Sequence, residues 1–554
     1  MKQEIAQALA GACKDLFNVD VTIELTRPDG QFGDFASNIA LQLAGQVGKN
    51  PREIGEALAE ALRGHASVAD VQVAGPGFLN ITLTDSALVM LADTRPERSL
   101  AGKTVLVEYS DPNPFKPLHA GHLYTTLVGD TLARLIQNAG AQTVRLNFGG
   151  DVGLHVGRCM WGIIQSLGGE LPEKLADIPE YERAAWMGTC YVAGTSAYED
   201  DEAAKAAIIA YNKRVYEVQA TGDHDTPFAQ LYWTCRQWSY EYFAVLYEQL
   251  EVVPFDRYIP ESEVTPLGVE TVRTQLANGV YEKSGEAVIF DGEKFGLHTR
   301  VFINSEGLPT YETKDVGLSL TKWDDYHFDE SIIITANEQS QYMQVVIKSI
   351  EQFAPEPAQR TRHLTHGMVK LQGGTKMSSR KGNIVTALEI LEAAREAGRE
   401  TGNSPDEHTI LAAVKYAFAK NRIGGDIAYD PKESIALEGN SGPYLQYAHA
   451  RARSILQKLQ FEAAPIENLE ADERTLLRKI GEYAEVVERA TNELLPHHIC
   501  TYLYELAQEF NRFYEKNRVV GDSRENVRAQ LVQKYADSLE NGLGLLGVYA
   551  PDKL

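Results

Sequence analysis

The sequence predicts an α/β protein of several domains whose central domain holds a parallel sheet. Three observations support this fold class. The chain has 554 residues, which is too many for a single hydrophobic core. Residues 105–151 follow the order strand, loop, helix and strand, which is the length of one βαβ crossover unit. From Asn440 onward the pattern is almost entirely helical. We therefore expect a Rossmann-like domain followed by an all-α bundle.

Residues 1–95 are predicted to form a small N-terminal α+β domain. Apolar residues recur at helical spacing over 4–16 and 51–62, and residues 33–38 form a loop that leads into a further helix. Residues 71–83 alternate as a strand does, with a turn at Gly75-Pro76-Gly77. The polar stretch 93–102 is typical of a linker.

Residues 96–435 are predicted to form the parallel-sheet domain, with an Ala-rich helical insertion over roughly 152–260. Further strands are expected at 288–290, 301–303, 331–336 and 364–371, the last as one strand. Residues 436–554 form the helical bundle.

Composition and charge limit the classes of protein that this chain can belong to. Hydrophobic residues make up 44% and charged residues 23%, as in soluble globular proteins, and no apolar run approaches the roughly 18 residues of a membrane span. The N-terminus is amphipathic and does not resemble a signal peptide. A net charge of -24 excludes a basic nucleic-acid coat protein, so any RNA surface is a local patch. We expect a cytoplasmic protein without a membrane partner.

The five cysteines are widely separated, and they form neither a C-x-x-C pattern nor a disulfide framework. We expect free thiols and no structural zinc or other metal site within the protein.

Two histidines open the helix that follows the first strand of the βαβ unit. His119, Gly121 and His122 stand where such a unit binds phosphate, since helix N–H groups and imidazoles both donate hydrogen bonds. Gly121 also leaves space for a planar base against the backbone. The alternative is a helix that begins with two incidental histidines. Lys116, three residues upstream, adds positive charge and favours phosphate binding.

A second candidate motif is the loop 373–383, which is rich in glycine, cations and hydroxyl groups. Lys376, Ser378 and Arg380 could close over a triphosphate and neutralise its charge. The alternative for such a loop taken singly is a solvated basic surface. Its occurrence downstream of the histidine motif favours the catalytic interpretation.

The two motifs together resemble the signatures HIGH and KMSKS of class I aminoacyl-tRNA synthetases, since the chain has HAGH at 119–122 and KMSSR at 376–380. The resemblance narrows to the arginyl-tRNA synthetase family and covers nearly the whole chain. The stretches similar to that family's motifs are GDFASN at 33–38, EYSDPN at 108–113, GGD at 149–151, YETKD at 311–315, NSGPYLQYAHAR at 440–451 and FNRFY at 510–514.

The resemblance implies ATP-dependent ligation of L-arginine to tRNA(Arg) through an arginyl-adenylate, with release of pyrophosphate and AMP. It implies Mg²⁺ together with ATP, a monomer, an N-terminal domain that contacts tRNA and a C-terminal domain that binds the anticodon. Two alternatives remain at this stage: a class I synthetase for another amino acid such as lysine or cysteine, and a non-catalytic tRNA-binding paralogue. The missing zinc-type cysteines argue against cysteine, and the intact motifs argue against the paralogue.

The resemblance also assigns the arginine-binding residues. Glu108 and Asp315 would accept hydrogen bonds from the guanidinium, and Tyr311 would wall the same pocket. The α-amino and carboxylate groups would meet Ser110, Asn113, His122 and Gln339, although Gln341 or Gln344 could replace Gln339. The alternatives are a strand-end salt bridge for Glu108, a helix cap for Asp315 and simple packing for Tyr311. The Glu108 and Asp315 pair favours a cationic substrate without separating arginine from lysine.

For ATP, the resemblance implies that phosphates are held by Lys116, His119, Gly121, His122, Lys376 and Ser378. The catalytic residues would be Lys116, His119, His122, Lys376 and Arg380. Backbone groups at Met368 and Val369 would hold adenine, because a strand edge offers both N–H and C=O.

The chain departs from the signature at Ser379, where the second lysine of KMSKS is missing. Lys116 is expected to supply the lost positive charge, and Arg380 and Lys381 are the other candidates.

Aromatic and basic residues interleave at the start of the C-terminal domain. Tyr444, Tyr447 and Arg451 are expected to contact tRNA by stacking on bases and pairing with phosphates. The alternative for the tyrosines is the core of the bundle.

Overall fold

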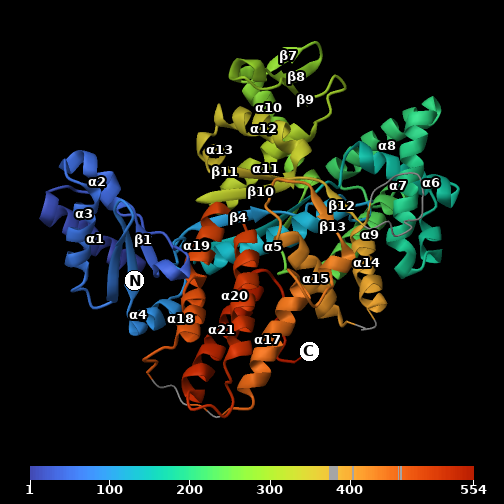
Figure 1. Cartoon of the computed structure of the whole chain (residues 1–554). Coiled ribbons are helices and arrows are strands. Elements are labelled where there is room, and N and C mark those ends of the chain that lie inside the picture. Colours follow the sequence, from blue (N-terminus) through green and yellow to red (C-terminus); the bar gives the residue numbers. More distant parts are fainter. Residues whose placement is uncertain (373–384, 402–404, 460, 462–464, 554) are drawn as a thin grey trace.

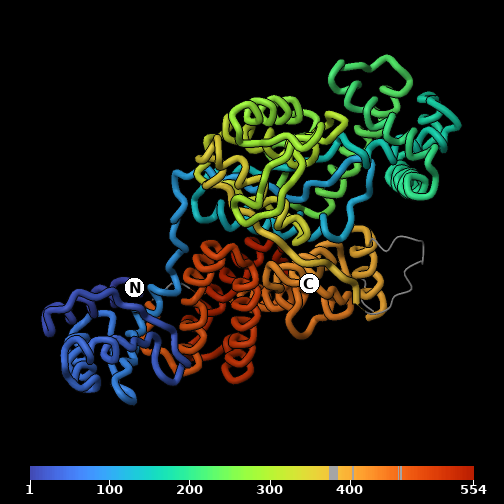
Figure 2. Tube along the Cα trace, turned by 90° about the horizontal axis from the view of Figure 1, so that it is seen from above, coloured from blue at the N-terminus to red at the C-terminus, as the bar shows by residue number. Residues whose placement is uncertain are grey.

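The computed structural model describes residues 1–372, 385–401, 405–459, 461 and 465–553. Figure 1 shows an N-terminal domain at one side, a central sheet, a helical insertion at the opposite side and a C-terminal bundle below the sheet. Figure 2 shows that an extended segment joins the N-terminal domain to the sheet. Within the described part of the chain, no helix combines the length and the apolar character needed to cross a membrane.

The N-terminal domain packs four helices on a three-stranded antiparallel sheet of order β1-β3-β2. Its elements are α1 (Lys2–Phe17), β1 (Phe35–Ser37), α2 (Ile39–Val47), α3 (Pro51–Leu62), β2 (Val68–Ala74), β3 (Phe78–Leu83) and α4 (Asp85–Ala92). The alternating stretch is a hairpin that reverses at the predicted turn, where Gly75 and Gly77 have φ of 52° and 140°. Residues 35–37, predicted as part of a loop, form a short strand because they pair with 79–81.

The central sheet has five strands in the order β11-β10-β4-β5-β6, and every neighbouring pair is parallel. The strands are β4 (Thr104–Glu108), β5 (Gln142–Gly149), β6 (Arg257–Pro260), β10 (Glu330–Ala336) and β11 (Thr361–His366). The apolar runs of the three inner strands β10, β4 and β5 are buried on both faces, as a parallel sheet between helices requires, whereas the edge strands β6 and β11 are partly exposed. The predicted α/β class is confirmed.

Helix α5 (Ala120–Asn138) makes the crossover from β4 to β5. A side chain at Gly129 would place its Cβ 2.2 Å from Cγ of Tyr109, so the helix can lie close to the end of β4 only with glycine there. The remaining helices of this domain are α10 (Glu261–Ala277), α11 (Tyr311–Tyr326), α12 (Ser340–Glu351) and α13 (Pro355–Gln359).

Two insertions leave the sheet. The first is helical, with its own core around Cys159, Met187 and Tyr232. Its helices are α6 (Leu154–Leu167), α7 (Arg183–Asp200), α8 (Glu202–Thr221) and α9 (Pro227–Gln249). The second is an antiparallel sheet of β7 (Glu282–Ser284), β8 (Ala287–Phe290) and β9 (Arg300–Ile303), which projects at the top of Figure 1.

The single strand predicted over 364–371 is wrong. The chain leaves the parallel sheet after β11 and forms β12 (Val369–Leu371), which pairs with β13 (Ile427–Tyr429). The break falls at Gly367, where a Cβ would lie 2.4 Å from the backbone N of Asp426. The close approach of another backbone segment redirects the chain. The hydrophobic alternation of the sequence cannot predict this break, because it does not show which remote segment lies nearby.

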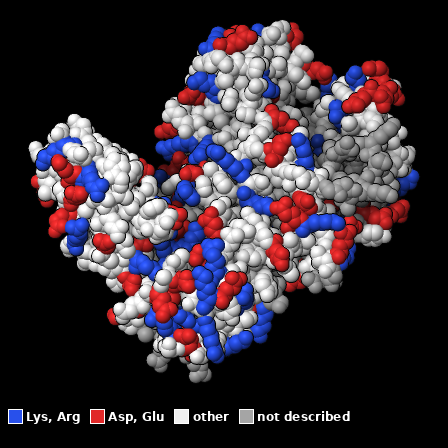
Figure 3. Space-filling view, viewed as in Figure 1, with Lys and Arg blue, Asp and Glu red and all other residues white. Residues whose placement is uncertain are grey.

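Residues from 436 onward are helical, as predicted, and form α17 (Gly442–Leu456), α18 (Ala471–Ile480), α19 (Tyr483–Glu493), α20 (His497–Lys516) and α21 (Glu525–Leu545). Three more helices precede them, within the range predicted for the parallel-sheet domain: α14 (Ala387–Glu400), α15 (Glu407–Ala419) and α16 (Pro431–Ser434). Helix α15 contacts both α5 and α17, so it joins the bundle to the helix that opens with the two histidines. In Figure 3 lysine and arginine side chains form a stripe down the bundle, with acidic side chains beside it.

The N-terminal domain is fixed to the bundle by Arg474 of α18. Its guanidinium donates to Asp34 at 2.5 Å, to Asp85 at 2.8 Å and to the carbonyl of Leu83 at 2.8 Å. Asp34 is buried and also accepts from the N–H of Leu83 at 2.7 Å. The acidic residue of the GDFASN stretch therefore links two domains.

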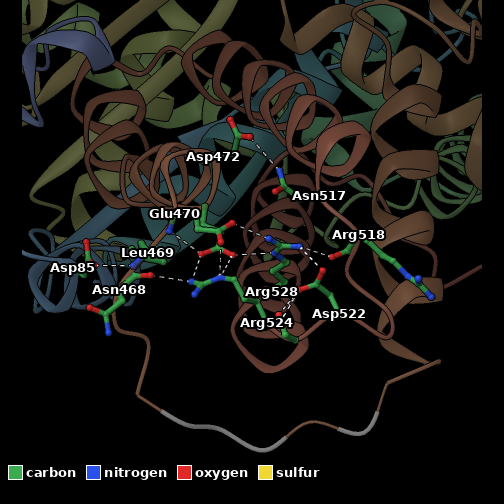
Figure 4. Close-up of polar contacts among 12 residues, drawn as sticks. Asp85, Asn468, Leu469, Glu470, Asp472, Asn517, Arg518, Asp522, Arg524 and Arg528 are labelled. Atoms are coloured by element: carbon green, nitrogen blue, oxygen red, sulfur yellow. Dashed lines mark hydrogen bonds and ion pairs between the residues drawn. The ribbon is translucent and has the colours of Figure 1, made fainter.

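The start of α18 is joined to the start of α21 around Glu473, and Figure 4 draws polar contacts among the neighbouring residues Glu470, Arg524 and Arg528. Glu473 is fully buried and accepts hydrogen bonds from Arg524 Nε at 2.8 Å and Arg528 Nε at 2.9 Å. Burial by itself raises the pKa of Glu473, but hydrogen bonds from these arginines and from the Glu470 N–H hold that pKa below its usual value.

We expect Glu473→Ala to lower the free energy of unfolding by about 3 kcal/mol at pH 7, because it leaves two arginines facing a buried gap. Urea-induced unfolding measures the effect, and Glu515→Ala, on the exposed side of α20, is the matched control. Because the folded-state pKa is lowered, the stabilisation is present above the usual carboxyl pKa and is lost as the pH falls through the lowered value. Equal effects of the two variants would contradict this role.

Candidate active site

A cavity of about 500 Å³ opens at the carboxyl ends of β4, β10 and β11. Ligands bind at this edge in open parallel sheets, where the strand order reverses. The cavity brings together many of the residues proposed from the sequence. Those that line it are Glu108, Ser110, Asn113, His119, Gly121, His122, Tyr311, Asp315 and Gln339. Gln341 lines a neighbouring depression instead.

The two histidines form one end of the cavity. Their rings stack with centroids 3.7 Å apart and planes at 20°. His119 is the N-cap of α5, and its Nδ1 accepts hydrogen bonds from the N–H groups of Gly121 at 3.1 Å and His122 at 3.3 Å. The backbone N–H of His119 in turn donates to His122 Nδ1 at 3.5 Å. In both rings Nδ1 is an acceptor, so Nε2 carries the proton in the neutral form.

Both imidazoles are neutral at pH 7. Burial, together with the positive charge of Lys116, lowers the pKa of His119 to about 4. Burial, together with His119 and Lys116, lowers the pKa of His122 well below its ordinary value. Each ring can therefore donate one hydrogen bond from Nε2 without carrying a charge.

The first N–H groups of α5, predicted from the sequence to bind phosphate, already have acceptors within the protein. The N–H of Ala120 donates to the carbonyl of Val385 at 2.7 Å, and those of Gly121 and His122 are taken by His119. A histidine cap satisfies the donors that a helix start usually leaves free. Gly121 is required for a further reason, because a Cβ there would lie 3.0 Å from Cε1 of His119.

The other end of the cavity is acidic. Glu108 and Lys322 form a buried ion pair at 2.8 Å, and the Lys322 ammonium also donates to Ser331 at 3.1 Å. The salt-bridge alternative considered for Glu108 is therefore present, and its charge is already balanced although it lines the cavity.

Asp315 lies in the second turn of α11 and is not a helix cap. The Tyr342 hydroxyl donates to its carboxylate. Burial, followed by the nearby charges of Glu108 and Glu261, raises the pKa of Asp315 well above its ordinary value. Proximity of a cation would favour the ionised form, so Asp315 is suited to a cationic ligand. Tyr311 is 51% exposed and lines the cavity beside it.

Three further carboxylates that the sequence reasoning missed line the cavity, and they belong to Asp111, Glu261 and Glu338. Glu261 directly follows β6 and pairs with Lys314 at 2.5 Å. Asp111 accepts the N–H of Phe148 at 2.7 Å, and burial followed by the charge of Glu108 raises its pKa well above the ordinary value. A carboxylate at the carboxyl end of a parallel strand was a signal that could have identified Glu261.

Polar side chains between the two ends are held firmly. Ser110 Oγ is hydrogen-bonded to the hydroxyls of Tyr247 at 2.8 Å and Thr126 at 2.7 Å. Asn113 lies against Gly150, where a Cβ would come within 2.1 Å of Asn113 Oδ1. Gly150 therefore lets Asn113 reach the cavity.

Three described residues proposed for ATP, Lys116, Met368 and Val369, do not line the cavity. Lys116 is not among the described residues that line the cavity, and its ammonium lies 4.6 Å from the ring centroid of Tyr191 in α7. Met368 donates its N–H to Asp426 at 2.9 Å and accepts from Ile427 at 2.8 Å, so both backbone groups assigned to adenine are engaged. In a parallel ladder alternate residues face opposite edges, which turns the N–H and C=O of Val369 away from β13.

Lys376, Ser378, Ser379, Arg380 and Lys381 lie outside the described residues. Among the residues that the structure does describe, no group of three or more His, Cys, Asp or Glu side chains is placed to hold a metal ion.

The residues proposed for tRNA lie on the bundle, away from the cavity. The Tyr444 hydroxyl accepts from Asn511 at 2.9 Å, and the Arg451 guanidinium lies 4.7 Å from the ring centroid of Tyr514. Tyr447 is 49% exposed and is therefore not in the bundle core.

Family models match the chain in three consecutive parts. The arginyl tRNA synthetase N-terminal domain matches residues 1–83, the catalytic domain of class I tRNA synthetases (R) matches 86–429, and the DALR anticodon binding domain matches 445–554.

Individual proteins match over their whole length. The chain is 28% identical to an arginine–tRNA ligase of Porphyromonas gingivalis, covering 100% of this chain and 99% of the relative. It is 29% identical to one of Bdellovibrio bacteriovorus, covering 95% and 93%. The solved Thermus thermophilus arginyl-tRNA synthetase has the same fold, with a TM-score of 0.79, 24% identity and full coverage of both chains.

We expect ¹⁵N-histidine NMR to show His119 as the Nε2–H tautomer at pH 7, with a titration midpoint near pH 4. The His119 signal is assigned by its loss in His119→Gln. Because this pKa is lowered on folding, the unfolded chain takes up a proton first, and His119 destabilises the fold as the pH falls from about 6.5 to 4. A midpoint near the ordinary value would contradict the buried neutral cap.

Proposed function

The chain belongs to the arginyl-tRNA synthetase family of class I tRNA synthetases, and from this premise we propose how its cavity performs the reaction. The protein is an arginine–tRNA ligase, so the alternatives of a lysine or cysteine enzyme and of a non-catalytic paralogue are set aside. One observation carries the proposal: a single cavity has a buried acidic end and, opposite, a stacked pair of neutral histidines.

L-Arginine binds with its guanidinium at the acidic end. Asp315 is the principal acceptor, since Tyr342 gives its carboxylate only a neutral donor, whereas lysines pair with Glu108 and Glu261. Tyr342 orients it, Tyr311 walls the pocket and Glu261 adds negative charge. Glu108 acts mainly through its ion pair with Lys322, because that pair already balances its charge. This arrangement is supported by the ion pairs of these carboxylates, since Glu108 and Glu261 each have a lysine partner and Asp315 has only the Tyr342 hydroxyl.

The α-amino and carboxylate groups of arginine meet Ser110, Asn113, His122 and Gln339, which lie between the two ends. Ser110 is a good anchor because two hydroxyl groups fix its orientation. The α-carboxylate then faces the histidine end, where ATP must present its α-phosphate.

ATP binds with its phosphates near the Nε2–H groups of His119 and His122, and Gly121 keeps this wall open. Val369, with its backbone turned away from β13, holds adenine, and Met368 contributes only its position. Lys376, Ser378 and Arg380 are proposed to close over the phosphates. Lys116 supplies the positive charge missing at Ser379 by turning from Tyr191 toward the cavity.

The reaction then proceeds in two steps. A carboxylate oxygen of arginine attacks the α-phosphorus of ATP, the bond to the bridging oxygen of the β-phosphate breaks, and pyrophosphate leaves. Mg²⁺ bound together with ATP would neutralise part of the phosphate charge. The 2′-hydroxyl of the terminal adenosine of tRNA(Arg) next attacks the arginyl carbonyl carbon, and AMP leaves. Positioning and the donors around the phosphates account for catalysis, and no enzyme nucleophile is needed.

The domains divide the work on tRNA. Residues 436–554 contact the anticodon region, with Tyr447 at the surface, Arg451 half-buried and Tyr444 positioned by Asn511. Residues 1–95 contact the tRNA body, carried by the bundle through Arg474. The protein acts as a cytoplasmic monomer in this proposal, and light scattering on the purified chain tests its mass.

We expect Asp315→Asn to raise the arginine KM about 30-fold or more, because a charge-assisted hydrogen bond to the guanidinium is lost. Tyr342→Phe should raise it about 3- to 10-fold, since only the orienting donor is removed. ATP–pyrophosphate exchange with tRNA present measures both, and Asp324→Asn on the exposed side of α11 is the control. If arginine and ATP KM values rose equally, Asp315 would have no guanidinium role.

We expect Lys116→Met to lower the rate of adenylate formation about 100-fold, as removal of one stabilising group from developing phosphate charge does. Rapid quench of a single turnover measures this rate. Lys103→Met removes an exposed lysine from the same domain and serves as control. A rate close to that of the control would show that Lys116 stays with Tyr191 throughout the reaction.

A further inference from the structure

A third histidine lines the cavity near the first two. His366 is the last residue of β11, where its side chain reaches the ligand-binding edge of the sheet. It is only 2% exposed, and its ring lies 4.6 Å, between centroids, from that of Tyr124 in α5. Its charge, when present, lowers the pKa of both His119 and His122, so the three rings share one neighbourhood.

The tautomer of His366 is fixed by its own backbone. Its Nδ1 lies 2.7 Å from the carbonyl oxygen of Gly367. A carbonyl oxygen can only accept, so Nδ1 must carry the proton and Nε2 must present a lone pair. Burial lowers the pKa of His366, which keeps the ring in this neutral form.

His366 is therefore the opposite of the other two histidines. His119 and His122 use Nδ1 as an acceptor and present Nε2–H, whereas His366 uses Nδ1–H and presents a bare Nε2. Phosphate oxygens at pH 7 are hydrogen-bond acceptors, so the acceptor Nε2 of His366 cannot form a hydrogen bond with them. The adenosine part of ATP offers donors, in the adenine amine and the ribose hydroxyls.

We propose that His366 Nε2 accepts a hydrogen bond from a donor of the adenosine moiety of ATP. The inference rests on the proposed function, which places ATP at the histidine end of the cavity. The position agrees with it, because His366 stands three residues before Val369, whose backbone is turned away from β13 and is proposed for adenine. A purely packing role against Tyr124 would be served as well by phenylalanine.

The first measurement is the ATP KM of His366→Phe in ATP–pyrophosphate exchange with tRNA and saturating arginine. Phenylalanine keeps the ring against Tyr124 and removes the acceptor. We expect the ATP KM to rise about 3- to 10-fold, as loss of one neutral hydrogen bond predicts, with the arginine KM within about twofold of wild type. His363→Phe is the matched control, because His363 lies on the same strand, binds Thr335 at 2.7 Å and is not among the described residues lining the cavity.

The second measurement identifies the donor with ATP analogues. Purine riboside triphosphate lacks the amine, and 2′-deoxyATP and 3′-deoxyATP each lack one hydroxyl. For the analogue that lacks the donor, wild type and His366→Phe should have nearly equal KM values, while for ATP and the other analogues the variant should remain about 3- to 10-fold worse. Convergence on purine riboside triphosphate assigns the amine, and convergence on a deoxy analogue assigns that hydroxyl.

Two outcomes would overturn the inference. One is an ATP KM of His366→Phe within about twofold of wild type. The other is an equal penalty for ATP and all three analogues, which would mean that the ring only packs. The wild-type KM values are a further test, because the inference requires at least one analogue to bind wild type more weakly than ATP does. Equal KM values for ATP and all three analogues would contradict it. Failure of the proposed function would look different, because wild type would then show no arginine-dependent exchange.

Discussion

The parallel register of β4 between β10 and β5 is the constraint on which the rest of the molecule depends. It aligns Glu108 with Ile333 and Leu146, so that the strands end at one edge of the sheet. Most residues that line the cavity come from a strand end or from the helix that follows it, and Arg300 comes from β9 of the antiparallel insertion. The helical insertion begins just beyond the carboxyl end of β5, at the same edge of the sheet.

At that edge the cavity has two chemically different ends, a neutral histidine end and an acidic end, and hydrogen bonds within the protein fix the polar groups of each. His119 caps α5 by accepting backbone N–H groups at Nδ1. These hydrogen bonds fix the tautomer of the ring, so that Nε2–H is left for a ligand in the cavity. At the acidic end, lysines balance Glu108 and Glu261, whereas Tyr342 gives Asp315 only a neutral donor. The one carboxylate without a lysine of its own among these three is thus the strongest attractor for a guanidinium.

Hydrogen bonds from charged side chains also connect the domains. A single arginine of the bundle, Arg474, holds two carboxylates and a carbonyl of the N-terminal domain. Helix α15 contacts both the bundle helix α17 and the active-site helix α5. The surfaces proposed for tRNA are therefore mechanically continuous with the helix that begins at His119.

The sequence by itself determined the α/β class, the helical bundle and the stretches that meet at the cavity, because periodicity and short motifs are local properties of the chain. It could not decide how charges are shared. Lys322 neutralises Glu108 from 214 residues away, Glu261 enters from the end of another strand, and Gly367 breaks a strand because Asp426 lies against it. Lys116 lies over Tyr191 for the same kind of reason. Ion pairing, burial and tautomer depend on distances between segments remote in sequence, and only the tertiary structure fixes those distances.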